Sequence, residues 1–361
     1  MVTISLAMIV KNEEKNIRRC LNSVYGVVDE IIIVDTGSKD KTKEICSLYT
    51  DKVYDFKWID DFSAARNYSY ELATMEYILW LDADDYLLPE DVIKLKKLKK
   101  NISSEYNAIM MKYVTGLDSK GNETFSYYRE RLTKKSCNFQ WNEPVHEYLD
   151  TSGPIGESNI RIIHGKKRKT ALKSGRNLKI YERYLKEKGY LSPRGTYYYA
   201  RELKDHNRIK EAINQYELFL DTNMGWLEDN IAACSDLAKC YFEINLDTLA
   251  LTTLFKSFLY DTPRAEVCCQ IGYHYQEKEE YERAIYWFQL ILTLKMPKNC
   301  WGFMQPDCWA YIPLIECAVC YDRLGDYKKA LQFNNRALKH KPDSIQAKRN
   351  QDYLQKKLSA L

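Results

Sequence analysis

The chain has 361 residues, enough for two or three domains, and 45% of them are hydrophobic, so it can bury a full core. Charged residues make up 29% and the net charge is only +4, which excludes a disordered or fibrous chain and gives no general case for binding nucleic acid or a membrane surface. No signal-peptide pattern surrounds residues 3–10 and no apolar run could span a membrane, so we expect a cytoplasmic protein without an integral membrane segment, whose eleven cysteines stay reduced.

The first hundred residues alternate short apolar runs with helical patterns. The apolar runs predict strands at 3–10, 30–34, 52–56 and 77–81. The helical patterns predict helices at 14–24, 41–49, 62–73 and 89–100. Because the strands are apolar enough to be covered on both faces, this alternation predicts an α/β domain with a mostly parallel sheet. Less regular strands are expected at 108–115, 124–132 and 160–164.

Beyond residue 169 almost every segment has helical period, and one turn-then-helix phrase recurs. The phrase ends in Ala212, Ala250, Ala284 and Ala330, at spacings of 38, 34 and 46 residues, which bracket the 34-residue tetratricopeptide period. We therefore expect an all-helical repeat domain with a longer insert at 295–313. Cys317 and Cys320 are three residues apart on one expected helix face, which favours buried thiols over a zinc site.

Three segments follow from these patterns. Residues 1–165 are expected to form the α/β domain, 166–195 a helical linker and 196–361 the helical repeat domain. The basic run at 166–169 is expected to belong to a solvated linker helix, and the alternative is that it holds phosphate or an acidic acceptor.

Acidic residues follow two of the expected strands. Asp35 ends the second strand beside a glycine-containing turn, from which a carboxylate can accept hydrogen bonds from a base or a ribose; a simple strand end is the alternative. Asp82, Asp84 and Asp85 follow the fourth strand. Three like charges there repel one another unless a cation is present, which favours a Mg²⁺ or Mn²⁺ site over a cap for the next helix.

Polar residues of other segments could complete such a site. Arg66 and Asn67 follow small residues at a helix start, a form that suits a phosphate or sugar oxygen as well as a plain surface position. His146 and Glu147 lie in one short phrase with an aromatic residue, and His164 ends a strand. Each histidine alone is more often a satisfied polar residue than a ligand.

Taken in order, five phrases resemble the family 2 glycosyltransferases of the GT-A (nucleotide-diphospho-sugar transferase) fold. They are I-x-K-N-E at 9–13, V-D-T-G-S-x-D-x-T at 34–42, A-R-N at 65–67, L-D-A-D-D at 81–85 and V-H-E at 145–147. The resemblance covers about residues 1–165. A narrower likeness links the chain to members with a C-terminal tetratricopeptide domain, including the S-glycosyltransferases that modify sublancin-type bacteriocin peptides.

The resemblance implies a nucleotide sugar, commonly a UDP-sugar, with Mn²⁺ or Mg²⁺ on its diphosphate. The implied nucleotide-sugar-binding residues are Val10, Asn12, Glu13, Asp35, Thr36, Ser38, Arg66, Asn67, Asp82 and Ala83. The implied metal ligands are Asp84 and Asp82, with His146 or His164 as a further ligand. The implied catalytic residues are Asp85 and Glu147; Glu147 stands where many members carry an E-D base motif.

We therefore expect an inverting, metal-dependent hexosyltransferase or N-acetylhexosaminyltransferase that modifies a Cys, Ser or Thr side chain of a peptide or protein. The helical domain would hold this acceptor or form a homodimer, since helical repeats create concave surfaces. Two alternatives stay open at this point. The enzyme could build a cell-surface polysaccharide or flagellar glycan, or the chain could be a non-catalytic repeat scaffold.

Overall fold

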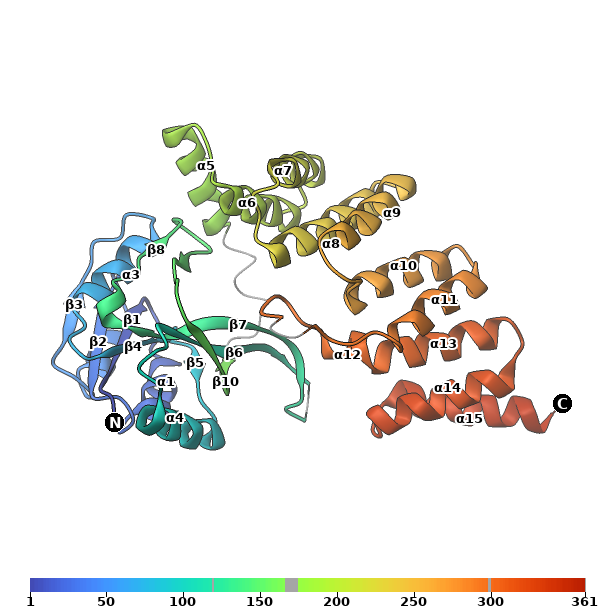
Figure 1. Ribbon diagram of the computed structural model, residues 1–361, viewed down its shortest axis with the longest axis horizontal. Helices are drawn as coiled ribbons and strands as arrows, with labels where there is room; N and C mark the ends of the chain where they lie inside the picture. The colour runs from blue at the N-terminus through green and yellow to red at the C-terminus, as the bar shows by residue number, and fades with distance from the viewer. Residues whose placement is uncertain (119, 166–174, 298–299, 361) are drawn as a thin grey trace. The chain divides into compact units, whose positions relative to one another are not determined.

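The computed structural model describes residues 1–118, 120–165, 175–297 and 300–360, and the basic run at 166–169 lies outside them. The chain forms two compact units, Met1–Arg208 and Ile209–Leu361 (Figure 1). An α/β domain followed by an all-helical domain confirms the expected fold class. None of the helices in the described ranges combines the length and the apolar character that crossing a membrane requires.

The first unit contains a mixed eight-stranded sheet. Its order is β3 (Val53–Asp55), β2 (Glu30–Asp35), β1 (Ile4–Val10), β4 (Tyr77–Trp80), β7 (Glu123–Lys134), β6 (Ala108–Leu117), β10 (Ile155–His164) and β5 (Asp85–Tyr86). The first four strands are parallel, as expected. The second half is mixed: β7 pairs antiparallel with both β4 and β6 and β5 antiparallel with β10, whereas β10 pairs parallel with β6, so four of the seven strand pairs are parallel.

Both faces of the parallel half are covered, and alternate residues of each strand supply the two cores. Leu6 of β1 and Leu79 of β4 pack on the face that receives α1 (Ile17–Val24) and α4 (Pro89–Asn101). The intervening residues, Ala7 and Trp80, face the second core, which includes Tyr70 of α3 (Phe62–Glu71). This two-residue alternation is what a strand buried on both faces requires. A short helix, α2 (Thr42–Cys46), links β2 to β3.

Two helices complete the first unit. These are α5 (Arg176–Lys188), which ends at Gly189 with a left-handed backbone, and α6 (Pro193–Asp205), which begins with Pro193 after a Ser192 cap. The division into compact units places both helices with the α/β domain, whereas the sequence predicted a linker at 166–195 and the repeat domain from residue 196. The reason is that α5 and α6 bond to the segment that contains the short strands β8 (Trp141–Asn142) and β9 (Tyr148–Leu149).

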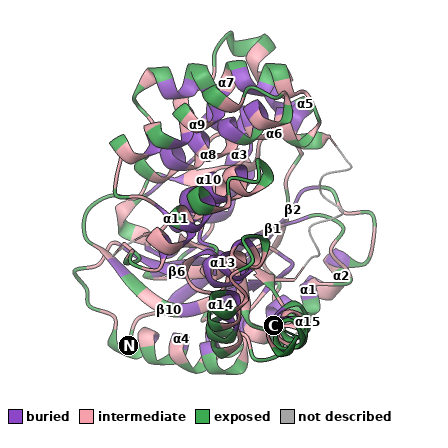
Figure 2. Cartoon of the chain, turned by 90° about the vertical axis from the view of Figure 1, so that its right-hand side faces the viewer, coloured by how far each residue is buried: buried purple, intermediate pink, exposed green. Residues whose placement is uncertain are grey.

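The second unit consists of successive helical hairpins. Its helices are α7 (Ile209–Thr222), α8 (Leu227–Glu243), α9 (Asp247–Lys256), α10 (Ala265–Glu277), α11 (Tyr281–Ile291), α12 (Pro306–Trp309), α13 (Tyr311–Arg323), α14 (Tyr327–His340) and α15 (Ile345–Ser359). Consecutive long helices pack against one another, and purple buried positions recur along them in Figure 2.

The recurring turn-then-helix phrase adopts the same local structure at all four places. Its first residue has a left-handed backbone, with φ values of 60°, 61°, 61° and 80° at Asn207, Asn245, Glu279 and Gly325. Its closing alanine is fully buried each time, where a small side chain lets two helices approach closely. Cys317 and Cys320 lie fully buried on α13, as the sequence predicted.

Candidate active site

The site lies at the carboxyl ends of β1, β2 and β4. Because these strands are parallel, the residues that follow them meet at one edge of the sheet, and Val10 pairs with Asp35 in register there. His164 reaches the same edge from the far half of the sheet, because the last residue of β10 pairs with Asp85 of β5. The mixed topology thus joins phrases that are about eighty residues apart in the sequence.

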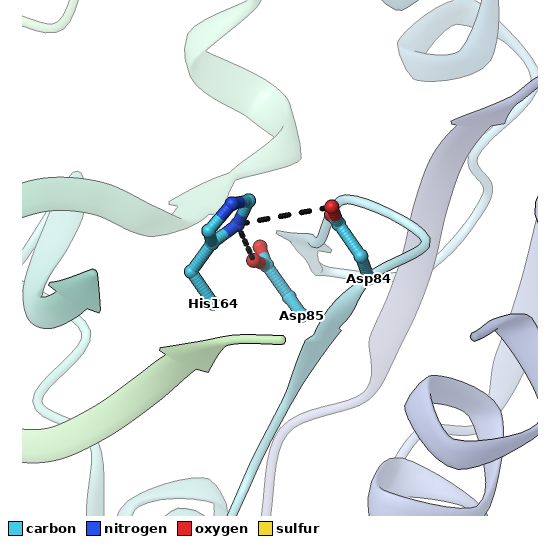
Figure 3. Close-up of side chains that lie close together, drawn as sticks. All are labelled: Asp84, Asp85 and His164. Carbon is cyan, nitrogen blue, oxygen red and sulfur yellow. Dashed lines mark ion pairs between the residues drawn. The ribbon is translucent and has the colours of Figure 1, made fainter. Parts of the chain in front are cut away.

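Three side chains at this edge could hold a metal ion. One ligand atom from each of Asp84, Asp85 and His164 lies within 4.8 Å of the others (Figure 3). His164 Nδ1 is 3.8 Å from both Asp84 Oδ2 and Asp85 Oδ1, and 2.8 Å from the hydroxyl of Tyr113. Asp85 Oδ1 is buried and has no hydrogen-bond partner. Two carboxylates, an imidazole and a buried unsatisfied oxygen fit a divalent cation such as Mn²⁺.

The other oxygen of Asp85 is held by the protein. Asp85 Oδ2 accepts a hydrogen bond from the Asp82 backbone amide at 3.0 Å and pairs with Arg131 Nη1 at 2.9 Å. Both side chains of the ion pair are fully buried, and the Arg131 guanidinium lies 3.7 Å from the centre of the Trp80 ring. Loss of either partner would leave the other as a buried charge without its counterpart, which is costly. The pair leaves Asp85 Oδ1 to face His164.

Asp82 is not part of this cluster and pairs with Arg66 instead. Arg66 Nη2 donates to Asp82 Oδ1 at 2.7 Å, and Arg66 Nε donates to Glu147 Oε1 at 2.6 Å. The guanidinium lies beside the edge-to-face pair of Trp80 and Trp141, at 4.8 and 4.9 Å from their ring centres. Burial works to raise the pKa of Asp82, but the charge and hydrogen bond of Arg66 lower that pKa below its usual range.

Asn67, the neighbour of Arg66, holds a strand. Its amide nitrogen donates to Trp141 O at 3.0 Å, and its amide oxygen accepts from Trp141 N at 2.7 Å. Both ends of the side chain are therefore engaged with the backbone of β8. Asn67 thus stabilises β8 in this structure, whereas the sequence predicted that it binds the nucleotide sugar.

The expected nucleoside end of the site is built from two interlocked loops. Asp35 Oδ1 accepts from the backbone amides of Gly37 and Ser38 at 2.9 and 2.8 Å. Ser38 Oγ in turn accepts from the Asn12 amide at 2.9 Å, and Thr36 Oγ1 donates to Val10 O at 3.1 Å. Asp35 Oδ2 is buried without a hydrogen-bond partner. A buried acceptor left open in this way is suited to a ligand donor.

Glu13 and Ala83, two of the predicted donor-binding residues, contact other parts of the protein. The Glu13 amide donates to Thr42 Oγ1 at 2.7 Å, and Glu13 Oε2 accepts from Asn16 at 2.9 Å. Ala83 is buried in the core on the α1 face of the sheet.

Of the two candidate histidines, the structure brings His164 to the carboxylates and places His146 elsewhere. His146 Nε2 forms a 2.7 Å hydrogen bond with Glu202 Oε1 on α6, and its ring stacks on Tyr198 with centres 4.6 Å apart. Sequence reasoning missed Arg131, Tyr113 and Glu202, because a polar residue within a strand or helix carries no signal of its distant partner.

Comparison with known proteins agrees with this geometry. Residues 5–155 match the model of Glycosyl transferase family 2. The SPbeta prophage-derived glycosyltransferase SunS of Bacillus subtilis is 30% identical over 236 residues, which are 61% of this chain and 55% of SunS. A TPR repeat-containing protein of Synechococcus elongatus is 36% identical over 152 residues, which are 42% of this chain and 36% of that protein.

This chain therefore spans about half of SunS and about a third of the Synechococcus protein. Among solved structures, a tetratricopeptide repeat protein of Parabacteroides merdae has a TM-score of 0.39 and 14% identity over 50% of this chain and 66% of that chain. The five sequence motifs all lie within the residues that match the family model, and several of them lie at the carboxyl edge of the sheet. Over residues 5–155 this chain is therefore similar to glycosyl transferase family 2.

Proposed function

We propose that the chain is an inverting, metal-dependent glycosyltransferase that moves a sugar from a nucleotide sugar to a peptide or protein side chain. The observation that carries the proposal is the Asp84, Asp85 and His164 cluster at the carboxyl edge of a family 2 domain. Asp85 Oδ1, which is buried beside His164 and has no hydrogen-bond partner, favours a cation-binding site over a non-catalytic scaffold.

The donor would lie along the edge from Asp35 to the cluster. The open oxygen Asp35 Oδ2 would accept a hydrogen bond from the base or the ribose of a UDP-sugar. Asp84, Asp85 and His164 would hold Mn²⁺ or Mg²⁺. When bound, the cation stabilises the charge that develops on the departing diphosphate.

Glu147 is the proposed general base. Its side chain is 13% exposed, and Arg66 Nε donates to its Oε1 at 2.6 Å, which orients the carboxylate. The other oxygen, Oε2, would accept the proton of the acceptor. A hydroxyl of Ser or Thr needs such a base within hydrogen-bond reach. A Cys acceptor needs less help, because a thiolate is accessible near neutral pH.

The acceptor class rests on the helical domain. Helical hairpin repeats form concave surfaces that suit extended peptides, and the second unit consists of such hairpins. The resemblance to peptide-modifying members of the family points the same way. Synthesis of a surface polysaccharide or flagellar glycan is the competing proposal for the same catalytic domain.

Donor turnover tests the catalytic proposal directly. The protein is incubated with Mn²⁺ and a panel of UDP-sugars, and UDP release by slow hydrolysis is measured. We expect release that depends on the metal and that falls about 100-fold or more in Asp84→Ala, because a ligand to the charge-stabilising ion is lost. Asp51→Ala, which removes an exposed acid of the same domain, is the control. No binding or turnover of any nucleotide sugar, or equal rates in the two variants, would refute the proposal.

A further inference from the structure

The segment that presents Glu147 has an unusual backbone. Between β8 and β9, Glu143 and His146 have φ values of 75° and 54°, in the left-handed region that side chains other than glycine disfavour. Each such residue costs on the order of 1 kcal/mol, and persists only where the surroundings determine it. The contacts that hold this loop therefore decide where Glu147 points.

One set of contacts comes from α3, inside the family-matched residues. The Phe62 amide donates to Pro144 O at 2.8 Å, and Ser63 Oγ donates to Glu143 O. These bonds hold the first half of the loop.

The second set comes from α5 and α6, beyond the matched residues. Tyr181 Oη donates to Val145 O at 3.1 Å, and Ser192 Oγ donates to a carboxylate oxygen of Glu143. Gly195 of α6 lies so close that an added Cβ would come within 3.0 Å of Glu143 Oε2. These two helices and the Ser192 cap thus contact Glu143, Val145 and His146 of the loop.

Glu202 is the central residue of this second set. Its Oε1 pairs with His146 Nε2 at 2.7 Å and accepts from Asn177 Nδ2 of α5 at 3.0 Å. The Glu202 side chain is 12% exposed. Burial works to raise its pKa, but the hydrogen bonds from His146 and Asn177 lower that pKa below its usual range. The carboxylate therefore holds the residue directly before Glu147 and ties α5 to α6 at once.

We propose that Glu202 is a positioning residue of the transfer reaction, which acts through His146 to fix the loop that presents Glu147. The helices α5 and α6 would then complete the active site of the family 2 domain. This inference rests on the proposed function and on Glu147 as its base. Its effect is on orientation, since a misplacement of about 1 Å can lower turnover about 100-fold.

Steady-state kinetics of the full chain test this role. In Glu202→Ala, we expect kcat for UDP-sugar turnover to fall about 30-fold or more while KM for the UDP-sugar stays within about twofold, because the Asp35 end of the site is unchanged. Glu202→Gln keeps an oxygen and an amide that can pair with His146, and should restore kcat to within about threefold of the parent. Glu187→Ala is the matched control, since Glu187 is an exposed acid on α5 whose recorded partner is Arg183 of the same helix.

The outcomes separate this inference from the proposed function. A parent protein that consumes no nucleotide sugar refutes the function itself. An active parent in which Glu202→Ala behaves like Glu187→Ala, or in which kcat falls and KM rises together without rescue by Gln, refutes the positioning role. If Glu202→Ala does not fold, Tyr181→Phe removes only the hydroxyl on Val145 O; an unchanged kcat there refutes the inference, and a threefold to tenfold fall supports it.

Discussion

A single guanidinium, that of Arg66, determines where two acidic side chains of the site lie. Its Nε and Nη2 donate to Glu147 and Asp82, and the guanidinium lies within 5 Å of the ring centres of Trp80 and Trp141. Lysine could not replace it, because an ammonium has neither the planar fork nor the stacking faces. The motif predicted that Arg66 belongs to the site. Its partners were not predictable, because they lie 16 and 81 residues away.

Glu30, at the start of β2, provides a prediction for pH. Burial works to raise the pKa of Glu30, but hydrogen bonds from Lys52, Ser5 and Thr74 lower it to about 2. The unfolded chain, with a pKa near 4.3, binds this proton first, so the stabilisation is present above about pH 5 and is lost as the pH falls toward 2.

We expect Glu30→Gln to lower the free energy of unfolding by about 2 to 3 kcal/mol at pH 7, with a smaller difference from the parent at pH 3. Urea denaturation followed by circular dichroism at pH 7, 5 and 3 measures it. Glu71→Gln, an exposed acid on α3, is the control. A difference that does not depend on pH would contradict the assignment.

At the scale of elements, the strands and helices with a clear hydrophobic period are the ones that the sequence predicts. The long strands and helices of the first hundred residues appear within a few residues of their predicted bounds, since burial on two faces gives each a repeating pattern. The two-residue strands β5, β8 and β9 could not be predicted, because two residues carry no period. These short strands are the ones that carry Asp85 and flank the Glu147 loop, so the least predictable elements lie at the site.

The end of β10 illustrates how closely these elements fit. The Gly165 amide donates to Asp84 O at 2.9 Å. An added Cβ at Gly165 would come within 1.7 Å of Arg19 Nη2 and 2.5 Å of Asp84 O. Any side chain there must displace the peptide of Asp84 or the guanidinium of Arg19, which stacks on Tyr86.

We expect Gly165→Ala to raise the Mn²⁺ concentration needed for half-maximal turnover by about tenfold or more, because it shifts Asp84 relative to His164. Metal titration of UDP-sugar hydrolysis measures this. The control is Gly156→Ala at the other end of β10, where the added carbon would contact Ile109 and Tyr106 in the core. That variant should lower stability and leave the metal dependence unchanged; the reverse pattern would contradict the proposed ligand set.

At the scale of the whole molecule, the order of the two domains was predictable and their division was less so. The change from alternating patterns to helical period marks the end of the sheet, and the repeated alanines mark the hairpins. Helical period alone could not show that α5 and α6 belong with the α/β domain, because their assignment depends on contacts with the loop at 143–147. The first compact unit ends at Arg208, so truncated chains should be designed around that residue.

Truncation should separate hydrolysis of the UDP-sugar from transfer of the sugar to a peptide. A chain that ends at Arg208 keeps every described contact of the first unit, so we expect it to retain UDP-sugar hydrolysis and lose transfer to a peptide. A chain that ends at Ser192 also lacks α6, so it should lose hydrolysis as well. UDP release and peptide mass shift measure the two activities. Peptide transfer at the parent rate by the longer fragment would contradict an acceptor-binding role for residues 209–361.

The thiols described above make the protein a convenient object for spectroscopy. Nine of its eleven cysteines are buried, and only Cys137 and Cys300 are partly accessible. Burial and the nearby Glu228 raise the pKa of Cys300 to about 11, so few of its molecules are reactive thiolates at neutral pH. Cys137 packs beside the core that contains Trp80 and Trp141. A dye or spin label attached there would report on the α/β domain of the unaltered sequence, without any cysteine having to be removed first.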